Sequence, residues 1–239
     1  MYKREFELAK SLGKEIGEFL KNQTVKHVNS LENKDIKLEL DKLSEKRIIE
    51  ALKANFDYSI LSEEAGLIGK IKSNEPYWII DPIDGTMNYS KDFPFACVSI
   101  ALWINNEPIL GVVYDFYKDE LFSGLAGSGA YLNEVPIKTS NIKEKSKAVL
   151  MTGFPVYMDF SIDNLISYVS EMKEYKKIRM LGSAALSLCY VACGRADAYR
   201  EENIKLWDVA AGVAINKALF NKIDIMYLKD YSTNIQVGV

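Results

Sequence analysis

The chain has 239 residues, of which 26% are charged, and its formal net charge is −3. Hydrophobic residues make up 48%, the balance of a globular protein, which excludes a disordered chain. The absence of a basic surplus argues against nucleic acid as the partner. The N-terminus lacks the apolar stretch of a signal peptide and no run is apolar enough to span a membrane, so we expect a cytoplasmic protein.

Helical spacing of apolar residues predicts amphipathic helices over 2–22 and 41–55, with a polar loop or hairpin between them. From about residue 58 the pattern changes, and the apolar run 77–81 predicts a buried strand. An antiparallel meander is predicted next, with strands over 95–105, 108–117, 119–124 and 129–132.

The lysine-rich segment 138–147 is the best candidate for a boundary, which divides the chain into subdomains 1–140 and 141–239. Beyond it the patterns predict strands over 148–153, 177–181 and 196–200, helices over 159–175, 183–193 and 207–219, and two short strands near the C-terminus. This order favours mixed α and β layers over a strict βαβ alternation.

Cysteine and histidine, which bind zinc and copper, are scarce. The odd count of three cysteines, Cys97, Cys189 and Cys193, argues against a disulfide framework, and we expect small apolar core residues. The single histidine, His27, stands in a polar stretch without a motif around it, so we expect it on the surface. Any metal site must therefore use oxygen ligands, which favours Mg²⁺, Mn²⁺ or Ca²⁺.

The segment Asp81-Pro-Ile-Asp84-Gly-Thr86 carries most of the chemical information. Two carboxylates three residues apart, separated by a stiff proline, can converge on one point at the end of a strand. Gly85 allows a close backbone approach, and a helix that begins at Gly85–Thr86 would attract a phosphate with its free N–H groups. Asp-Pro and Asp-Gly are also common turn dipeptides, so the segment alone is equally compatible with an ordinary turn.

Two further acidic segments favour a metal site. Glu63 and Glu64 follow an apolar pair and would need a counter-charge if they were buried together, although an exposed acidic pair is the simpler explanation. Asp208 would begin an apolar helix, where it could serve as the N-cap or reach a metal.

In order along the chain, Ser62-Glu63-Glu64, Asp81-Pro-Ile-Asp84-Gly-Thr86-Met-Asn88 and Trp207-Asp208-Val-Ala-Ala-Gly212 resemble the motifs of the inositol monophosphatase family of metal-dependent phosphatases. Phe93-Pro-Phe95, Thr152-Gly-Phe-Pro155 and 182–199 extend the likeness over most of the chain. The resemblance implies an α/β protein folded as an αβαβα layered sandwich, with mostly antiparallel sheets, two packed subdomains and a homodimer.

The resemblance also implies a role for each site residue. Metals, two or three Mg²⁺ with Mn²⁺ as a substitute, would be held by Glu63, Asp81, Asp84, Asp208 and the Ile83 carbonyl, with Glu64 beside a third ion. Thr86 and Asp41 would position and activate the attacking water, with Glu63 beside them. Substrate would contact Asp84, Gly85, Thr86, Gly182, Ser183, Ala184 and Glu201. Two metals about 3.5–4 Å apart can clamp both oxygens of an in-line displacement.

The expected reaction is hydrolysis of a phosphate monoester on a polyol, with inositol 1-phosphate as the expected substrate, because Asn88 and Glu201 resemble the polyol-phosphate members. Glu201 and Glu202 could instead be a solvated acidic pair. Fructose 1,6-bisphosphate, 3'-phosphoadenosine 5'-phosphate and histidinol phosphate remain alternative substrates. A non-catalytic member that binds a transcription complex would need a basic surface, for which 138–147 and 173–179 are candidates. The departure from the family after residue 218 leaves an inactive member as a third alternative.

Overall fold

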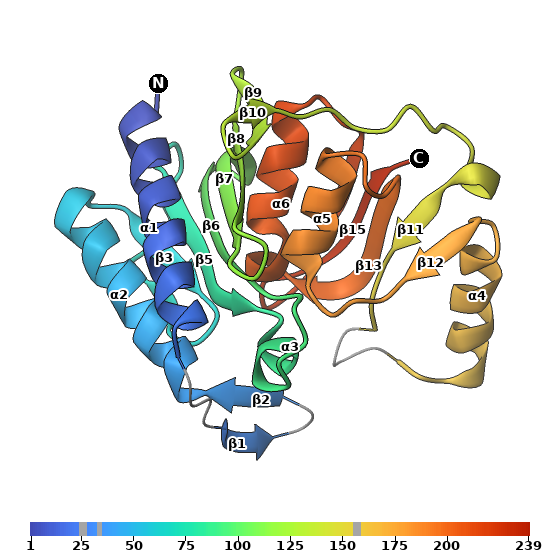
Figure 1. The fold of residues 1–239 in the computed structure, drawn as a ribbon, viewed down its shortest axis with the longest axis horizontal. Coiled ribbons are helices and arrows are strands. Elements are labelled where there is room, and N and C mark those ends of the chain that lie inside the picture. Colours follow the sequence, from blue (N-terminus) through green and yellow to red (C-terminus); the bar gives the residue numbers. More distant parts are fainter. Residues whose placement is uncertain (24–27, 33–34, 155–158) are drawn as a thin grey trace.

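The computed structural model describes residues 1–23, 28–32, 35–154 and 159–239, with the backbone alone for 28–32 and 35–38. His27 and Pro155 therefore lie outside the described residues. Five layers, α/β/α/β/α, follow one another across the molecule (Figure 1). The predicted αβαβα layered sandwich is confirmed.

The first layer consists of α1 (Lys3–Lys21) and α2 (Glu39–Asn55), close to the predicted helices. A hairpin of β1 (Val28–Glu32) and β2 (Asp35–Leu38) connects them. The apolar stripe of α1 packs on the first sheet. On α2 the buried face includes three polar residues, Asp41, Ser44 and Glu45, besides Ile48 and Leu52. A buried polar run on an amphipathic helix indicates that α2 borders a polar site.

The second layer is an eight-stranded sheet in the order β10-β9-β8-β7-β6-β5-β3-β4. Its strands are β3 (Ser59–Ser62), β4 (Gly66–Ile68), β5 (Tyr77–Asp84), β6 (Cys97–Ile104), β7 (Glu107–Asp115), β8 (Glu120–Leu125), β9 (Gly129–Leu132) and β10 (Val135–Pro136). Only the β3–β5 pair is parallel, and Ser62 lies opposite Ile80. Glu63, the residue after the end of β3, therefore comes next to Asp81, the next residue of β5.

The central layer, α5 (Ala184–Ala192) and α6 (Leu206–Ala218), lies between the two sheets (Figure 1). Both helices are apolar on nearly every side, as expected for helices buried between sheets. A glycine pair, Gly111 and Gly124, lies across β7 and β8 beneath α6. A Cβ atom on Gly111 would stand 2.2 Å from the Ala211 carbonyl oxygen, so α6 contacts the sheet backbone directly.

The fourth layer is a five-stranded sheet in the order β12-β11-β13-β15-β14, and α4 (Ile162–Met172) forms the fifth. Its strands are β11 (Val149–Met151), β12 (Lys177–Arg179), β13 (Ala198–Lys205), β14 (Ile223–Tyr227) and β15 (Ser232–Gly238). Short helices α3 (Thr86–Ser90) and η1 (Lys145–Lys147) complete the fold. In the described part of the chain, no helix is long and apolar enough to cross a membrane.

Candidate active site

The acidic residues of the DPIDGT segment stand at the end of β5. In a regular strand, side chains three residues apart point to opposite faces. Between Asp81 and Asp84 the pairing with β6 shifts register, since Asp81 lies opposite Ser99 and Asp84 opposite Cys97. Such a bulge re-aims side chains. It therefore lets both buried aspartates serve one site.

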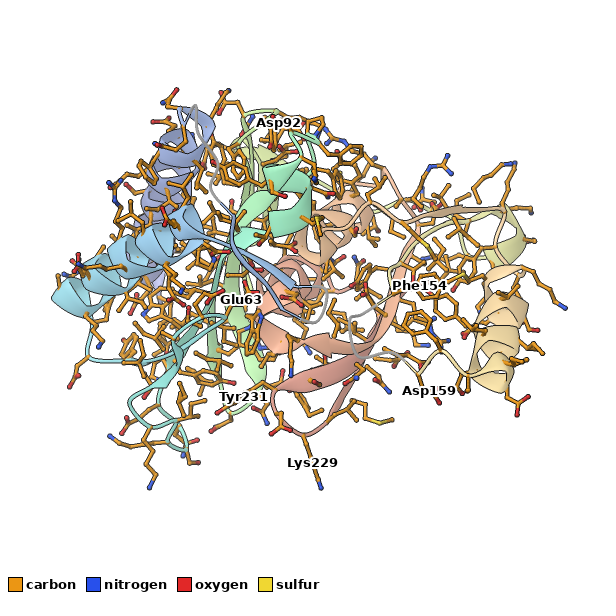
Figure 2. The ribbon with its side chains drawn as sticks, turned by 90° about the horizontal axis from the view of Figure 1, so that it is seen from below. Glu63, Asp92, Phe154, Asp159, Lys229 and Tyr231 are labelled. Carbon is orange, nitrogen blue, oxygen red and sulfur yellow. The ribbon has the colours of Figure 1, made fainter. Side chains whose placement is uncertain are left out.

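Four carboxylates from three elements influence one another's protonation. Burial, then the charges of Glu63, Asp84 and Asp208, raises the pKa of Asp81 well above its usual range. Burial and the charges of Glu63 and Asp84 likewise raise the pKa of Asp208. These four residues, predicted from the sequence as metal ligands, are therefore close neighbours. Glu63 lies in the N-terminal half, on the side facing Phe154 in the C-terminal half (Figure 2).

Asp208 is not the N-cap of its helix. Lys205 occupies the N-cap position, and Asp208 is the third residue of α6. The N-cap alternative is therefore wrong, because β13 runs directly into α6 and the helix begins earlier than the apolar pattern indicates. A hydrogen bond from the Lys205 backbone opposes the rise in the pKa of Asp208. From the first turn of α6, Asp208 lines a cavity at the start of the helix.

Asp84 is held by the start of α5. Its Oδ2 accepts hydrogen bonds from Ser183 Oγ at 2.6 Å and from the Ala185 N–H at 2.7 Å. Ser183 Oγ also accepts from the Leu186 N–H as the N-cap of α5. Burial raises the pKa of Asp84 to about 6 despite these bonds, which lower it. Ser183, predicted as a substrate contact, thus directs its hydroxyl to Asp84.

Thr86 links the DPIDGT segment to α2. Its Oγ1 donates to the Ile83 carbonyl at 2.9 Å and lies 3.3 Å from Asp41 Oδ2, within hydrogen-bond distance. Among the described residues the buried Asp41 Oδ1 has no hydrogen-bond partner. Burial, then the charges of Glu63 and Glu64, raises the pKa of Asp41 well above its usual range. The predicted pair of Thr86 and Asp41 is in contact.

Five of the seven predicted substrate residues line one cavity of about 210 Å³, and Gly85 and Thr86 are not among its lining residues. Its lining includes Asp84, Gly182, Ser183, Ala184, Glu201 and Asp208. Gly85 stands at the start of α3, where its φ of +92° and a virtual Cβ 2.8 Å from the Phe95 carbonyl require glycine.

Glu201 is buried inside this cavity, whereas Glu202 is exposed. The solvated-pair explanation is therefore wrong for Glu201. Tyr199 Oη donates to its Oε2 at 2.8 Å, and burial raises its pKa to about 7. A Cβ on Gly153 would stand 2.8 Å from Glu201 Oε1, so glycine there leaves room for the carboxylate.

The sequence did not indicate the supporting hydrogen bonds that two residues make at the site. Asn88, interpreted from the sequence as a marker of substrate class, donates from Nδ2 to the Phe95 carbonyl at 2.8 Å and to the Leu181 carbonyl at 2.6 Å. It therefore joins the two halves beside Gly182. Glu45 accepts hydrogen bonds from the loop that carries Glu63. Its place four residues after Asp41, on the same helix face, was the available signal.

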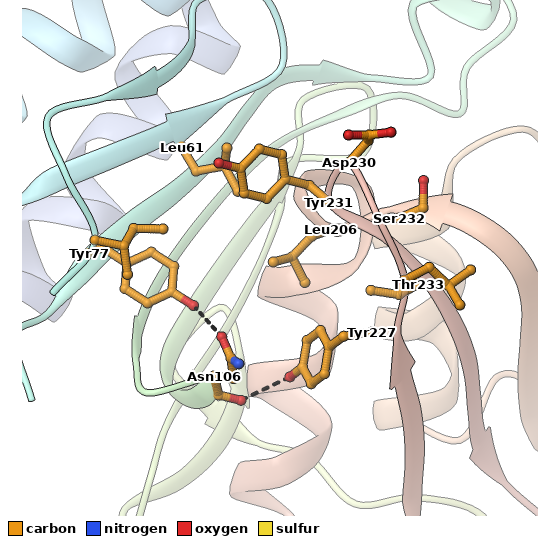
Figure 3. Close-up of a pocket in the computed structure, with 11 residues that line it drawn as sticks. Leu61, Tyr77, Asn106, Leu206, Tyr227, Asp230, Tyr231, Ser232 and Thr233 are labelled. Atoms are coloured by element: carbon orange, nitrogen blue, oxygen red, sulfur yellow. Dashed lines mark hydrogen bonds between the residues drawn. The ribbon is translucent and has the colours of Figure 1, made fainter. Parts of the chain in front are cut away.

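A second cavity, of about 420 Å³, lies between β3–β5 and the β14–β15 hairpin (Figure 3). Tyr77 Oη donates to Asn106 Oδ1 at 3.3 Å, and Tyr227 Oη donates to the Asn106 carbonyl at 2.9 Å. Asn106 thus connects the two sheets from the side opposite Asn88. Leu61 and Leu206, each two residues before a site carboxylate, also line it.

The donor set suits a hard cation. Among the described residues, no three His, Cys, Asp or Glu side chains already stand in an arrangement that could hold an ion. The site carboxylates nevertheless raise one another's pKa, because their negative charges repel one another. Carboxylate oxygens without nitrogen or sulfur donors are the ligands of Mg²⁺ and Mn²⁺.

A layered αβαβα fold with clustered carboxylates beside a polar cavity is typical of metal-dependent phosphomonoesterases. The profile of the "Inositol monophosphatase family" matches residues 1–219, and the chain belongs to that family. This membership supports phosphatase activity and a metal requirement.

Similar proteins carry two kinds of name. A protein from Xylella fastidiosa named "Nus factor SuhB" is 43% identical over 204 residues, covering 81% of this chain and 73% of its own. "Inositol monophosphatase 3" of Solanum lycopersicum is 41% identical over 218 residues, covering 88% of this chain and 80% of its own. The solved inositol monophosphatase from Anabaena (Nostoc) superposes with a TM-score of 0.84 at 36% identity, covering 99% of this chain and 90% of the other.

Proposed function

We propose that this protein hydrolyses a phosphate monoester of a polyol in a Mg²⁺-dependent reaction, with inositol 1-phosphate as the substrate. The observation that carries the proposal is the cluster of Glu63, Asp81, Asp84 and Asp208, whose carboxylates raise one another's pKa at the edge of a polar cavity. Such mutual repulsion is relieved when cations bind between the carboxylates.

Two Mg²⁺ ions would be held by the four carboxylates and the Ile83 carbonyl, with Glu64 beside a weaker third site. Four carboxylates supply a charge of about −4, which offsets two divalent cations and leaves a dianionic phosphate bindable. Mn²⁺ would substitute, since it prefers similar ligands. When bound, such metals acidify a water molecule and stabilise the leaving oxygen.

The chain's own residues would orient the water and the ester. Thr86 Oγ1 would position the water, and Asp41 Oδ1, which has no hydrogen-bond partner in the described part of the chain, would accept its proton. The backbone at Gly85 and Thr86 would bind phosphate. Glu201, fixed by Tyr199, would accept hydrogen bonds from the polyol hydroxyls, with Gly182, Ser183 and Ala184 beside it.

The first experiment measures phosphate release from myo-inositol 1-phosphate with and without Mg²⁺, for the wild type, Asp84→Asn and the exposed control Asp224→Asn. Magnesium-dependent turnover that is lost only in Asp84→Asn supports the proposal. Absence of turnover on this ester, with turnover of fructose 1,6-bisphosphate, 3'-phosphoadenosine 5'-phosphate or histidinol phosphate, changes the substrate. No turnover on any of them contradicts the phosphatase proposal.

A second candidate function is binding of the RNA of a transcription complex. The observation that favours it is that the two basic segments lie together: the Lys176 N–H donates to the carbonyls of Lys145 and Ala148. Part of this charge is compensated by Glu144 and Glu174. The similar Xylella protein is named a Nus factor. RNA binding that falls steeply between 50 and 200 mM salt, and is lost in Lys176→Glu with Lys177→Glu, would support it.

Two finer expectations remain proposals. The first is a pair of subdomains with a boundary near residue 140. The second is a homodimer, which light scattering coupled to size-exclusion chromatography checks directly.

A further inference from the structure

We propose that Glu45 of α2 is a positioning residue that holds Glu63 in place for metal binding. The inference rests on the metal-dependent function proposed above. Glu45 is 6% exposed, and the ion pairs of the described residues include none to it. A buried carboxylate without a cationic partner needs several hydrogen-bond donors.

The donors to Glu45 all come from the turn that contains Glu63. Glu45 Oε1 accepts from the Glu64 N–H at 3.1 Å, from the Ala65 N–H at 3.0 Å and from the Ser62 hydroxyl. Ser62 ends β3, and the turn leads into β4. The residues on both sides of Glu63 are thus attached to one oxygen atom of α2.

This arrangement determines where Glu63 can lie. The residue belongs to a short turn, and β4, at the sheet edge, has only three residues. Without Glu45, the N–H groups of Glu64 and Ala65 would lose their acceptor, and the turn could take other conformations. The Glu63 carboxylate would then lose its fixed place beside Asp81.

The same helix also carries Asp41, one turn earlier on the same face. Asp41 faces Thr86, and Glu45 faces the Glu63 turn. One rigid element therefore sets the distance between the group that would activate water and a group that would bind metal. Ile48 and Leu52, which follow on the same helix, pack in the core and fix the position of the helix against the first sheet.

The test is calorimetric titration of Mn²⁺ into the metal-free protein, which requires no substrate. The variants are Glu45→Ala, Glu45→Gln, Ser62→Ala and the control Glu50→Ala, an exposed glutamate of the same helix. We expect Kd for Mn²⁺ to rise about 10–100-fold in Glu45→Ala and to stay within about threefold in Glu45→Gln, which keeps an acceptor oxygen. Ser62→Ala, which removes one donor, should fall between them, and Glu50→Ala should match the wild type.

A kinetic split separates positioning from general loss of structure. Activity of Glu45→Ala should recover to within about fivefold of the wild type at saturating Mg²⁺, because only metal affinity depends on the turn. A Glu45→Ala protein that binds Mn²⁺ like the wild type overturns the inference. Equal losses of Mn²⁺ affinity in Glu45→Gln and Glu45→Ala overturn it as well, since they would mean that the charge of Glu45 matters and its acceptor oxygen does not. If Glu45→Ala does not fold, wild-type affinity in Ser62→Ala overturns it.

The proposed function can fail separately. A wild type that binds Mn²⁺ but hydrolyses none of the esters contradicts the phosphatase proposal and leaves the role of Glu45 intact. Magnesium-dependent turnover of the wild type, combined with wild-type Mn²⁺ affinity in Glu45→Ala, supports the phosphatase proposal and overturns the role of Glu45.

Discussion

The contact between α6 and the first sheet gives the sharpest prediction. In Gly111→Ala the new Cβ would stand 2.2 Å from the Ala211 carbonyl oxygen, whereas real contacts of this kind stay above 3.0 Å. The helix must therefore move away from β7 by about 0.8 Å, because both contacting groups are backbone. Overpacking of this kind costs about 1–3 kcal/mol of the free energy of unfolding, or more.

The same displacement would move Asp208 away from Asp81 and Asp84, which are attached to the sheet. Metal sites tolerate ligand shifts of only about 0.2 Å, and a misplacement of about 1 Å lowers activity about a hundredfold. We therefore expect Gly111→Ala to raise the Mg²⁺ concentration that gives half-maximal phosphate release and to lower the melting temperature. Both are measured on the purified variant.

Gly13→Ala is the matched control. It lies on α1, on the other face of β7, where a Cβ would stand 3.3 Å from Val112 Cγ1, a contact that a shift of a few tenths of an ångström relieves. Alanine also favours the helix by up to about 1 kcal/mol, so stability should stay within about 1 kcal/mol and activity should be unchanged. A Gly111→Ala protein with the wild-type magnesium curve would refute the idea that the contact of α6 with the sheet places Asp208.

Three further predictions concern the site. Burial raises the pKa of Asp84 from 3.8 to about 6, so its contribution to stability is present below pH 4 and is lost as the pH rises through 6. Calorimetry in EDTA should therefore show the metal-free protein about 3 kcal/mol less stable above pH 6 than below pH 4 on account of Asp84. Added Mg²⁺ should restore the stability lost at the higher pH. Asn88→Ala removes two hydrogen bonds beside Gly182 and should raise KM for the ester about tenfold. Tyr199→Phe removes the bond that lowers the pKa of Glu201, so the rise in substrate affinity with pH should begin above pH 7.

Each of these has a contrary result. Thermal stability in EDTA that increases from pH 5 to pH 8 would contradict uncompensated carboxylates at the site. The exposed Asn55→Ala serves as control for Asn88→Ala, and equal KM values in the two would mean that the hydrogen bonds of Asn88 do not shape the substrate cavity beside Gly182. For Tyr199→Phe, an unchanged profile of KM against pH would mean that Glu201 does not contact the substrate.

The sequence predicted those features of the fold that arise from long, regular patterns. The helices around Phe6 and Ile48 were found because their apolar residues recur at helical spacing over several turns. Strands β3 and β4 were not predicted, since four and three residues are too few to show a period. The parallel pairing of β3 with β5, which places Glu63 beside Asp81, depends on residues distant in sequence.

The site was predicted through its motifs, and its supporting contacts were not. Asp81, Asp84 and Asp208 stand in motifs that are specific when they occur together. The partners of Asn88 lie 7 and 93 residues away along the chain, so no local pattern reveals them. Ser183 also makes a contact that the sequence did not indicate, because its hydroxyl donates to Asp84 once α5 begins at Ala184.

The central helical layer has a consequence for synthesis on the ribosome. The inner face of the first sheet, with Ile79, Trp103 and Phe122, is covered by α5 and α6. The last strand of that sheet emerges about 80 residues before the end of α6, which at about 5–20 residues per second amounts to roughly 4–16 s. During that interval the apolar inner face of the first sheet lacks the two helices that cover it, so we expect this part of the core to remain incomplete. Because Asp208 belongs to α6, we expect the core and the acidic cluster to be completed only after α6 has been synthesised.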